Sequence, residues 1–234
     1  LLPVALRNLA VGGEFLLTTS GAGTNLYGGN NLENPYGRAT EPGFVRAIPE
    51  HEAADWRHEA ERRLARPLSS GEVSAFWRGE ALGSFAEHPR EHLSILWNKL
   101  RLSLGRYEVS DDHCLYWDAR YVALARAPLP GFGIVGVLGL AGLLLFALEI
   151  AGARHRHFAA LDPGAAIEVA LLFLAYLGTI VLTVTSDRAR LPLVPLLLPF
   201  AAWTLVAAGR AVASRSQDAF VRLALATFVG VLAV

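Results

Sequence analysis

The sequence predicts a membrane all-α bundle of about four transmembrane helices, residues 129–234, preceded by a mixed, mainly helical extramembrane domain, residues 1–128. The first observation is the charge distribution: 16 acidic and 14 basic residues lie before Leu129, but only 5 and 7 lie from there on. The second is that long apolar runs separate the later charges, and the third is that short polar loops join these runs. Such a division is expected when one chain meets two solvents.

The first part of the extramembrane domain reads as a strand followed by a loop. Residues 14–19 form a short apolar and β-branched run after two glycines, which predicts a strand. Residues 20–31 are rich in glycine and asparagine, which predicts a loop, and irregular structure should extend to about Pro49.

Three helices should follow this irregular region. A charged segment predicts a helix over residues 50–64. Ser69 and Glu72 fit a capping box that begins a second helix, ending near residue 87. Pro89 suits the first turn of a third helix, residues 89–104. Its apolar residues recur at helical spacing and form a face for packing or for the bilayer surface: Leu93, Leu96, Trp97, Leu100 and Leu104.

Four apolar segments are the predicted membrane spans: residues 131–151, 165–186, 191–208 and 219–234. A helix needs about 20 mainly apolar residues to cross the hydrocarbon core, so the first two are long enough. The third is slightly short and contains Pro192, Pro195 and Pro199, which predict a broken helix that lines a cavity. The fourth is long enough to span only if the Arg222 side chain lies along the helix and places its guanidinium group at the membrane interface.

The loop charges predict how the chain is oriented. Residues 152–164 contain Arg154 and Arg156, and residues 209–222 contain three further arginines. The positive-inside rule makes these loops cytoplasmic, so residues 1–128 and 187–190 should face outward. The sequence therefore predicts an integral membrane protein of the bacterial inner membrane, with residues 1–128 on the periplasmic side and membrane lipid as a partner.

Composition excludes several classes of function. The formal net charge is zero, so nothing indicates a nucleic-acid partner. Cys114 is the only cysteine, so no disulfide framework or paired-cysteine metal site is expected. The run from Asp111 to Cys114 carries ligand-type side chains, but consecutive residues rarely converge on one ion. We therefore predict no metal site and identify no cofactor.

The glycine pair Gly21 and Gly23 resembles the start of a dinucleotide-binding fingerprint. The third glycine position is Leu26, and no alternating strand and helix pattern follows, so a nucleotide site is not expected. A polar loop that contacts substrate and an ordinary structural turn both remain open for this segment.

The turn Asp187-Arg188-Ala189-Arg190, between the second and third predicted spans, has two interpretations. Arginines at the outer end of a membrane turn oppose the positive-inside bias, and they can simply reach the lipid headgroups. Alternatively, two guanidinium groups held at the bilayer surface can bind a phosphate through paired hydrogen bonds.

Several stretches of the sequence, in the same order along the chain, resemble motifs of one family of membrane enzymes. Residues 20–31 read SGAGTNLYGGNN and are similar to the family's SNGGxNFYxGNN. A second group, FWR at 76–78, HP at 88–89, KL at 99–100 and YEVSD at 107–111, is similar to its YWxxxAlxxixxHP…KlxxFw…YEvsDn run. Residues 187–195, DRARLPLVP, are similar to its sRYRLPlvPll segment. The family is that of bacterial GT-C membrane glycosyltransferases resembling dolichyl-phosphate-mannose–protein mannosyltransferases.

The resemblance implies transfer of a sugar from a polyprenyl-phosphate donor to a glycan or protein acceptor at the outer membrane face. By resemblance, Arg188 and Arg190 contact the donor phosphate, and Asn25, Tyr27 and Asn30 lie in a loop near the active-site cavity. The family's acidic catalytic residue lies in an earlier external loop, so the catalytic residue of this chain stays unknown and is expected upstream. Ala189 stands where the family usually has tyrosine, which puts an aromatic contact there in doubt.

The sequence therefore favours a C-terminal fragment of a glycosyltransferase. Two other functions remain open: a membrane-anchored protein that binds a glycan or a protein partner, and half of a transporter, for which the expected broken third helix is the supporting feature.

Overall fold

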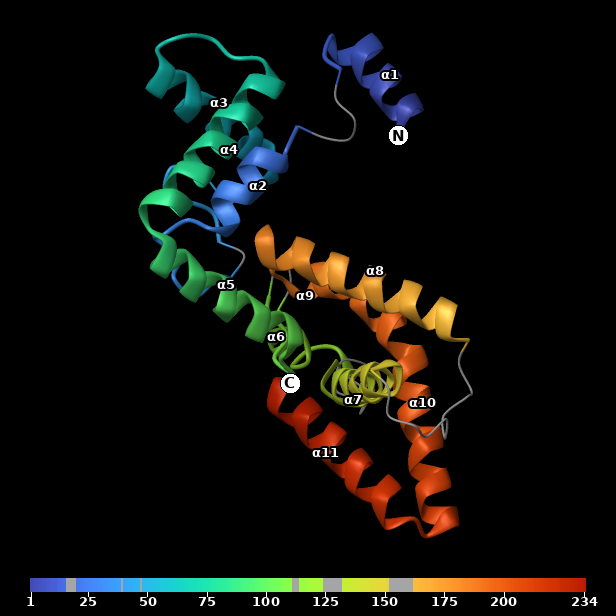
Figure 1. Cartoon of the computed structure of the whole chain (residues 1–234). Helices are drawn as coiled ribbons and strands as arrows, with labels where there is room; N and C mark the ends of the chain where they lie inside the picture. Colours follow the sequence, from blue (N-terminus) through green and yellow to red (C-terminus); the bar gives the residue numbers. More distant parts are fainter. Residues whose placement is uncertain (16–19, 39, 47, 111–113, 124–131, 152–161) are drawn as a thin grey trace. The chain divides into compact units, whose positions relative to one another are not determined.

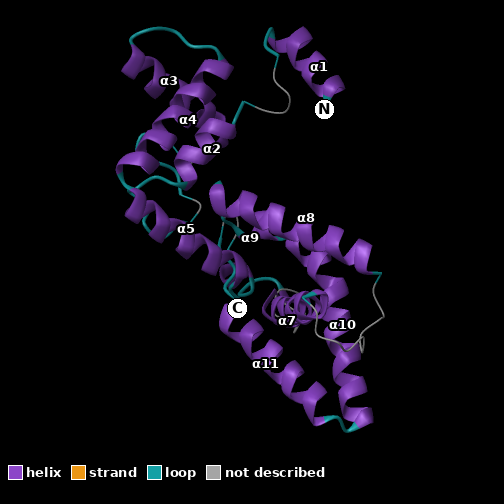
Figure 2. Ribbon diagram, viewed as in Figure 1, coloured by secondary structure: helices purple, strands orange, loops and turns teal. Residues whose placement is uncertain are grey.

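The computed structural model describes the whole chain except residues 16–19, 39, 47, 111–113, 124–131 and 152–161 (Figure 1). Over the described residues the regular secondary structure is helical and no strand is present (Figure 2). The helices are α1 (Leu2–Gly12), α2 (Ala22–Gly29), α3 (Pro49–Leu64), α4 (Ser70–Glu87), α5 (Pro89–Leu104), α6 (Leu115–Asp118), α7 (Phe132–Ile150), α8 (Pro163–Leu182), α9 (Asp187–Arg190), α10 (Leu193–Ser214) and α11 (Gln217–Ala233).

Contacts between residues divide the chain into two compact units. Unit 1 consists of Leu1–Lys99 together with Leu182–Val184, and unit 2 consists of Leu100–Val181 together with Thr185–Val234. The predicted change of solvent near Pro128 is a different kind of boundary. It falls among residues 124–131, outside the described part of the chain, and stays a prediction.

The three helices predicted from local sequence signals are confirmed as α3, α4 and α5, the last of which continues from unit 1 into unit 2. The capping box forms as expected, because the Glu72 amide donates to Ser69 Oγ at 3.3 Å and the Ser69 amide donates to Glu72 Oε2 at 2.9 Å. Helix α5 begins at Pro89. Proline suits this position because the first N–H of a helix has no intrahelical partner, so its absence costs no hydrogen bond.

An aromatic core joins α2, α3 and α4. The rings of Trp56 and Trp77 meet edge to face with centroids 4.8 Å apart, and Trp77 Nε1 donates to the Trp56 carbonyl at 3.1 Å. Trp77 is fully buried, and Phe44 stacks on its ring at 5.1 Å. Aromatic pairs at these separations contribute about 0.5–1.5 kcal/mol beyond area burial, so this cluster fixes how the three helices pack.

The predicted loop over residues 20–31 is wrong, because Ala22–Gly29 forms α2. Glycine favours turns in isolation, but here Gly23, Gly28 and Gly29 form the buried side of a helix that packs on α4. The Gly23 amide donates to Ser74 Oγ of α4 at 3.0 Å. Close packing therefore overrides the local preference. The strand predicted over residues 14–19 lies mostly outside the described residues, and Phe15 is not in a strand.

The apolar face predicted for α5 is divided: Leu100 and Leu104 pack against the hydrophobic core of unit 2, but the residues nearer the start of the helix do not. Leu93 and Trp97 are 69% and 58% exposed, whereas His92, Ile95 and Lys99 are buried. Their spacing of three and four residues is that of one helix face. Two of the three are polar, so the pattern of apolar residues does not reveal this buried side of the helix.

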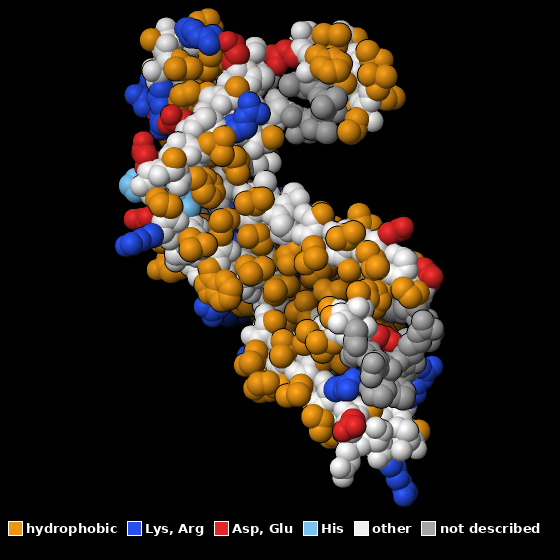
Figure 3. Space-filling view, in the orientation of Figure 1, with side chains coloured by type: hydrophobic (Ala, Val, Ile, Leu, Met, Phe, Trp, Pro, Cys, Tyr) orange, Lys and Arg blue, Asp and Glu red, His pale blue; other side chains and the backbone are white. Residues whose placement is uncertain are grey.

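Unit 2 contains three helices that are long and apolar enough to cross a membrane: α7, α8 and α10. Helix α11 has 17 residues and is not among them, so the fourth predicted span is not confirmed. Helix α10 runs without interruption past Pro199 to Ser214. Within the predicted segment, the chain is interrupted at Leu191–Pro192, between α9 and α10, whereas Pro195 and Pro199 do not break α10. Hydrophobic side chains cover much of the visible face of α8, α10 and α11 (Figure 3).

Small residues allow the spans of unit 2 to approach closely. A Cβ on Gly142 of α7 would lie 2.1 Å from the Phe200 carbonyl oxygen of α10. Beside it, Thr204 Oγ1 donates to the Leu138 carbonyl at 2.8 Å, which links the two helices through a hydrogen bond. Figure 1 shows α7 between the arms of the α10–α11 hairpin, and it packs against both. Small residues and interhelical hydrogen bonds are the usual basis of packing between membrane helices.

Candidate functional site

The Asp187–Arg190 turn forms the short helix α9 in unit 2, and several bonds hold it in place. Ser186 caps it, because its Oγ accepts from the Ala189 amide at 3.2 Å. The Asp187 amide donates to the Val109 carbonyl at 2.8 Å, and Tyr176 donates its hydroxyl to the Ala189 carbonyl at 2.9 Å. The turn is therefore fixed to the segment after α5 and to the side of α8.

Arg190 points into unit 2 and is 2% exposed. Its guanidinium donates to Glu108 Oε2, to the Gly105 carbonyl and, at 3.4 Å, to the Leu102 carbonyl. The face of Phe132 lies 4.3 Å away from the guanidinium carbon. This charge is thus paired, hydrogen-bonded and covered by an aromatic ring, which are the conditions under which a protein tolerates a buried arginine.

Arg188 is exposed, in contrast to Arg190. Two residues along a helix differ by about 200° in direction, because one turn takes 3.6 residues. The two guanidinium groups therefore leave α9 on different sides. The sequence predicted that both contact the donor phosphate, and this stays a prediction. The buried position and the carboxylate partner of Arg190 favour a positioning role for it, whereas Arg188 is the exposed arginine of this turn.

Asn30 lies directly after α2, and it belongs to a polar cluster in unit 1. Its Nδ2 donates to the carbonyls of Leu26 and Leu182, at 2.8 Å and 2.7 Å. Its Oδ1 accepts from Lys99 Nζ at 3.1 Å, and the same ammonium group donates to the carbonyls of Gly29 and Thr183 at 2.9 Å and 2.7 Å. Three donors thus meet three acceptors, so the cluster ties residues 29–30, Lys99 and residues 182–183 together.

Burial decides the electrostatics of this cluster. Lys99 is fully buried, and desolvation lowers the pKa of its ammonium group to about 7. Gly29 is required beside it, because a Cβ there would lie 1.7 Å from the Thr183 carbonyl oxygen. The Asn30 side chain is therefore bonded to Lys99 and to two backbone carbonyls, which gives it a structural role.

Tyr27 and Asn25 face different cavities, although both lie on α2. Tyr27 and Asn30 line a cavity of about 370 Å³ whose wall includes Glu80 and Glu87. The Tyr27 ring packs 4.7 Å from that of Trp77, and burial raises the pKa of its phenol despite the nearby Arg63 guanidinium. Of the predicted set, Tyr27 and Asn30 thus line one cavity and Asn25 lines another.

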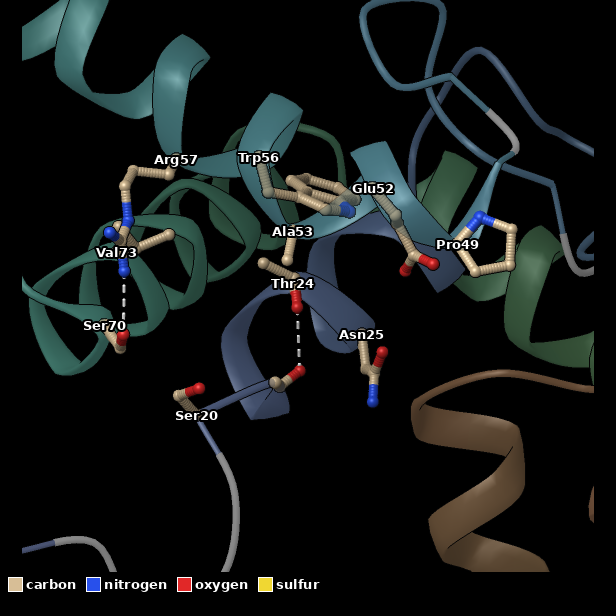
Figure 4. Close-up of a pocket in the computed structure, with 11 residues that line it drawn as sticks. Ser20, Thr24, Asn25, Pro49, Glu52, Ala53, Trp56, Arg57, Ser70 and Val73 are labelled. Carbon is tan, nitrogen blue, oxygen red and sulfur yellow. Dashed lines mark hydrogen bonds between the residues drawn. The ribbon is translucent and has the colours of Figure 1, made fainter. Parts of the chain in front are cut away.

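Asn25 lines a second cavity in unit 1, of about 270 Å³ (Figure 4). Figure 4 shows Asn25 and Glu52 near Pro49 at one end, Arg57 and Ser70 at the other, and Trp56 between them. Arg57 Nη2 donates to Ser70 Oγ at 2.8 Å, and Thr24 Oγ1 donates to the Gly21 carbonyl at 2.9 Å. The cavity is therefore lined by hydrogen-bond donors and acceptors, with the buried Trp56 ring between them.

Sequence reasoning did not single out Lys99 or Glu108 as functional residues. The signal for Lys99 was present, since it is the only lysine in a chain of 234 residues that otherwise uses arginine. Glu108 lies in the YEVSD segment, but nothing local identifies Arg190, 82 residues later, as its partner. No group of three or more potential metal ligands is found among the described residues, and residues 111–113 of the acidic run lie outside them. In comparisons with known proteins, no family model, no curated protein and no solved structure matches this chain.

Proposed function

We propose that this chain is part of an integral-membrane glycosyltransferase that moves a sugar from a polyprenyl-phosphate-linked donor to an acceptor at the outer membrane face. The observation that carries the proposal is the α9 turn. It carries Arg188, an exposed residue, on a backbone fixed by Arg190, Glu108 and the Asp187–Val109 bond. A fixed arginine beside spanning helices suits the recognition of a lipid phosphate, because a guanidinium matches phosphate oxygens bidentately.

The two segments joined at this turn are also segments on which the family resemblance rests. Residues 107–111 and 187–195 are far apart in sequence, yet Glu108 pairs with Arg190 and Val109 bonds to Asp187. This convergence supports reading them as one site rather than as separate chance matches. The acidic residue that would accept the proton of the acceptor hydroxyl is not assigned.

The test is donor kinetics on the whole protein of which this chain is part, reconstituted in liposomes with polyprenyl-phosphate sugars. Loss of a charge-assisted contact costs about 1.5–3 kcal/mol, so Arg188→Ala should lower kcat/KM for the donor roughly 10- to 100-fold. Arg188→Lys should recover part of this loss. Arg215→Ala, in the connection between α10 and α11, is the matched control and should leave donor use unchanged.

Two results would overturn parts of this proposal. If no polyprenyl-phosphate sugar serves as a donor under any acceptor condition, the transferase function is wrong. If transfer occurs but Arg188→Ala behaves like Arg215→Ala, Arg188 serves only the lipid interface. The transporter alternative keeps only part of its supporting feature, because the interruption at Leu191–Pro192 lies before α10, which is continuous.

We further propose that α11 is the fourth span and that the chain lies in the bacterial inner membrane with unit 1 on the periplasmic side. Helix α11 rises about 25 Å at 1.5 Å per residue, slightly less than the roughly 30 Å core. In unit 2 the Arg106 amide donates to the Val234 carbonyl at 3.0 Å, so α11 returns to the chain just after α5. The hairpin turn at Arg215 then lies on the opposite, cytoplasmic side.

Cysteine labelling tests this topology in a Cys114→Ser background. With a membrane-impermeant maleimide, Ser214→Cys should react only after the inner face is opened, whereas Ala233→Cys should react from outside. Labelling of both from the same side would show that α11 does not cross the membrane.

A further inference from the structure

We propose that the 270 Å³ cavity of unit 1 lined by Asn25, Glu52 and Arg57 binds one neutral saccharide unit, which, if the proposed function holds, belongs to the acceptor glycan (Figure 4). The cavity lies where the first turn of α2 faces the first turns of α3 and α4. It is distinct from the α9 turn, which lies in unit 2.

The size of the cavity limits the ligand. Small-molecule sites commonly enclose about 300–1,000 Å³, so a site of 270 Å³ suits a group near the size of a single sugar ring. The apolar part of the lining is rigid and already covered. Trp56 is 4% exposed and meets Phe44 and Trp77 edge to face, and Val73 is 7% exposed. Little apolar area therefore remains for a lipid chain.

The polar groups of the lining match hydroxyl groups, which both donate and accept. The Asn25 amide offers a donor and an acceptor, the Glu52 carboxylate accepts, and the Arg57 guanidinium donates. The backbone amides of Asn25 and Glu52 bond to Gly21 and Ile48, but among the described residues neither the Asn25 side chain nor the Glu52 side chain has a hydrogen-bond partner, and both residues are exposed. At the start of α2, which follows Gly21, the Gly23 amide already donates to Ser74 Oγ at 3.0 Å, so the cavity's polar contacts come mainly from its side chains.

An anion is a poorer occupant than a neutral polyol. Glu52 would repel a phosphate or carboxylate in the same cavity. The neighbouring N-terminus of α4 is already filled by an anion of the chain itself, because the Glu14 carboxylate accepts from the amides of Ser70 and Gly71 at 3.1 Å and 2.7 Å. The amides of Ser70 and Gly71 are therefore already bonded to Glu14 and cannot form an anion site. Mixed donors and acceptors with a nearly balanced charge are what a sugar requires.

Saturation-transfer NMR on the detergent-purified full chain tests the proposal, because it detects weak ligands of large particles. The probes are methyl α-glucoside, methyl α-mannoside and N-acetylglucosamine, with inorganic phosphate as the anionic comparison. At least one sugar should bind, and loss of one hydrogen bond should weaken it roughly three- to tenfold in Asn25→Ala and in Glu52→Gln.

The matched control is Glu50→Gln. Glu50 lies in the same first turn of α3 as Glu52 and is exposed, but it does not line the cavity. It removes the same favourable charge from the helix N-terminus, so it isolates the contact made by Glu52. Sugar binding in Glu50→Gln should match that of the unchanged protein.

Three outcomes would overturn the inference: no binding of any sugar, binding that Asn25→Ala and Glu52→Gln leave unchanged, or phosphate binding in place of sugar. These outcomes are separable from failure of the proposed function. Sugar transfer without cavity-dependent binding refutes the cavity alone, and cavity-dependent binding without donor use refutes the transferase alone.

Discussion

Replacing Arg190 by alanine tests whether the α9 turn is held by its buried charge. The change leaves the Glu108 carboxylate without its cation and removes the donors to the Gly105 and Leu102 carbonyls. Removing one partner of a buried ion pair costs about 3–5 kcal/mol. The Glu108 side chain keeps 21% of its exposure and can regain some hydration, so we take the lower end, about 3 kcal/mol.

This destabilisation is large enough to measure directly. For a chain of this length, 1 kcal/mol shifts Tm by roughly 2–4 °C, so Arg190→Ala should lower Tm by roughly 6–12 °C. The assay is thermal unfolding of the detergent-purified protein, followed by helical circular dichroism. Arg188→Ala is the control from the same turn, and because Arg188 is exposed rather than buried, it should lower Tm by clearly less than Arg190→Ala does.

A double-mutant cycle assigns the effect to the pair. Because uncompensated burial of Glu108 causes much of the loss, adding Glu108→Gln to Arg190→Met should restore part of the stability. The reasoning would be refuted if Arg190→Ala and Arg188→Ala lowered Tm equally, or if Glu108→Gln had the same effect whether or not Arg190 was present.

Two other predictions concern the packing of each unit. In unit 2, Gly142→Ala places a Cβ against the Phe200 carbonyl and should destabilise the protein by about 1–3 kcal/mol in the same thermal assay. Gly178→Ala is the control, because nothing lies within 4 Å of a Cβ there, and it should be neutral or stabilising. In unit 1, the pKa of about 7 for Lys99 lies below its unfolded value of 10.5, so the unfolded chain binds more protons between these two pH values. The free energy of unfolding should therefore rise with pH in this range, by at most about 1.4 kcal/mol per pH unit. Lys99→Met should remove this slope from urea unfolding measured at pH 7 to 10, and an unchanged slope would contradict the assignment to Lys99.

The sequence predicted the elements whose signals are local. Helix α4 was foreseen because Ser69 and Glu72 carry both halves of a capping box within four residues. Helix α5 was foreseen because Pro89 marks its start and helical spacing follows. The spans α7 and α8 were foreseen because length and composition alone decide whether a helix can cross a bilayer.

The failures have a common physical cause, which is packing between segments distant in sequence. Composition predicts a loop for α2, but its glycines are needed where the helix meets other backbone, as at Gly29 and Thr183. The apolar spacing of α5 points to Leu93, although the buried side holds Lys99, whose acceptors come from residues 29, 30 and 183. The residues around a buried polar side chain do not indicate its partners. The packing of α2 and the hydrogen bonds of Lys99 therefore cannot be predicted from either segment alone.

The same cause separates the roles of two arginines that the sequence treats alike. Arg188 and Arg190 are equivalent in charge and nearly adjacent, but only Arg190 faces the carbonyls at the end of α5 and the Glu108 carboxylate. For both to bind one phosphate, Arg190 would have to leave these acceptors, and Glu108 would remain close to the incoming anion and repel it. One ligand arginine fixed by one structural arginine avoids that cost. Donor affinity should therefore follow the charge at position 188, while Arg190 variants should lose folding stability and donor affinity together.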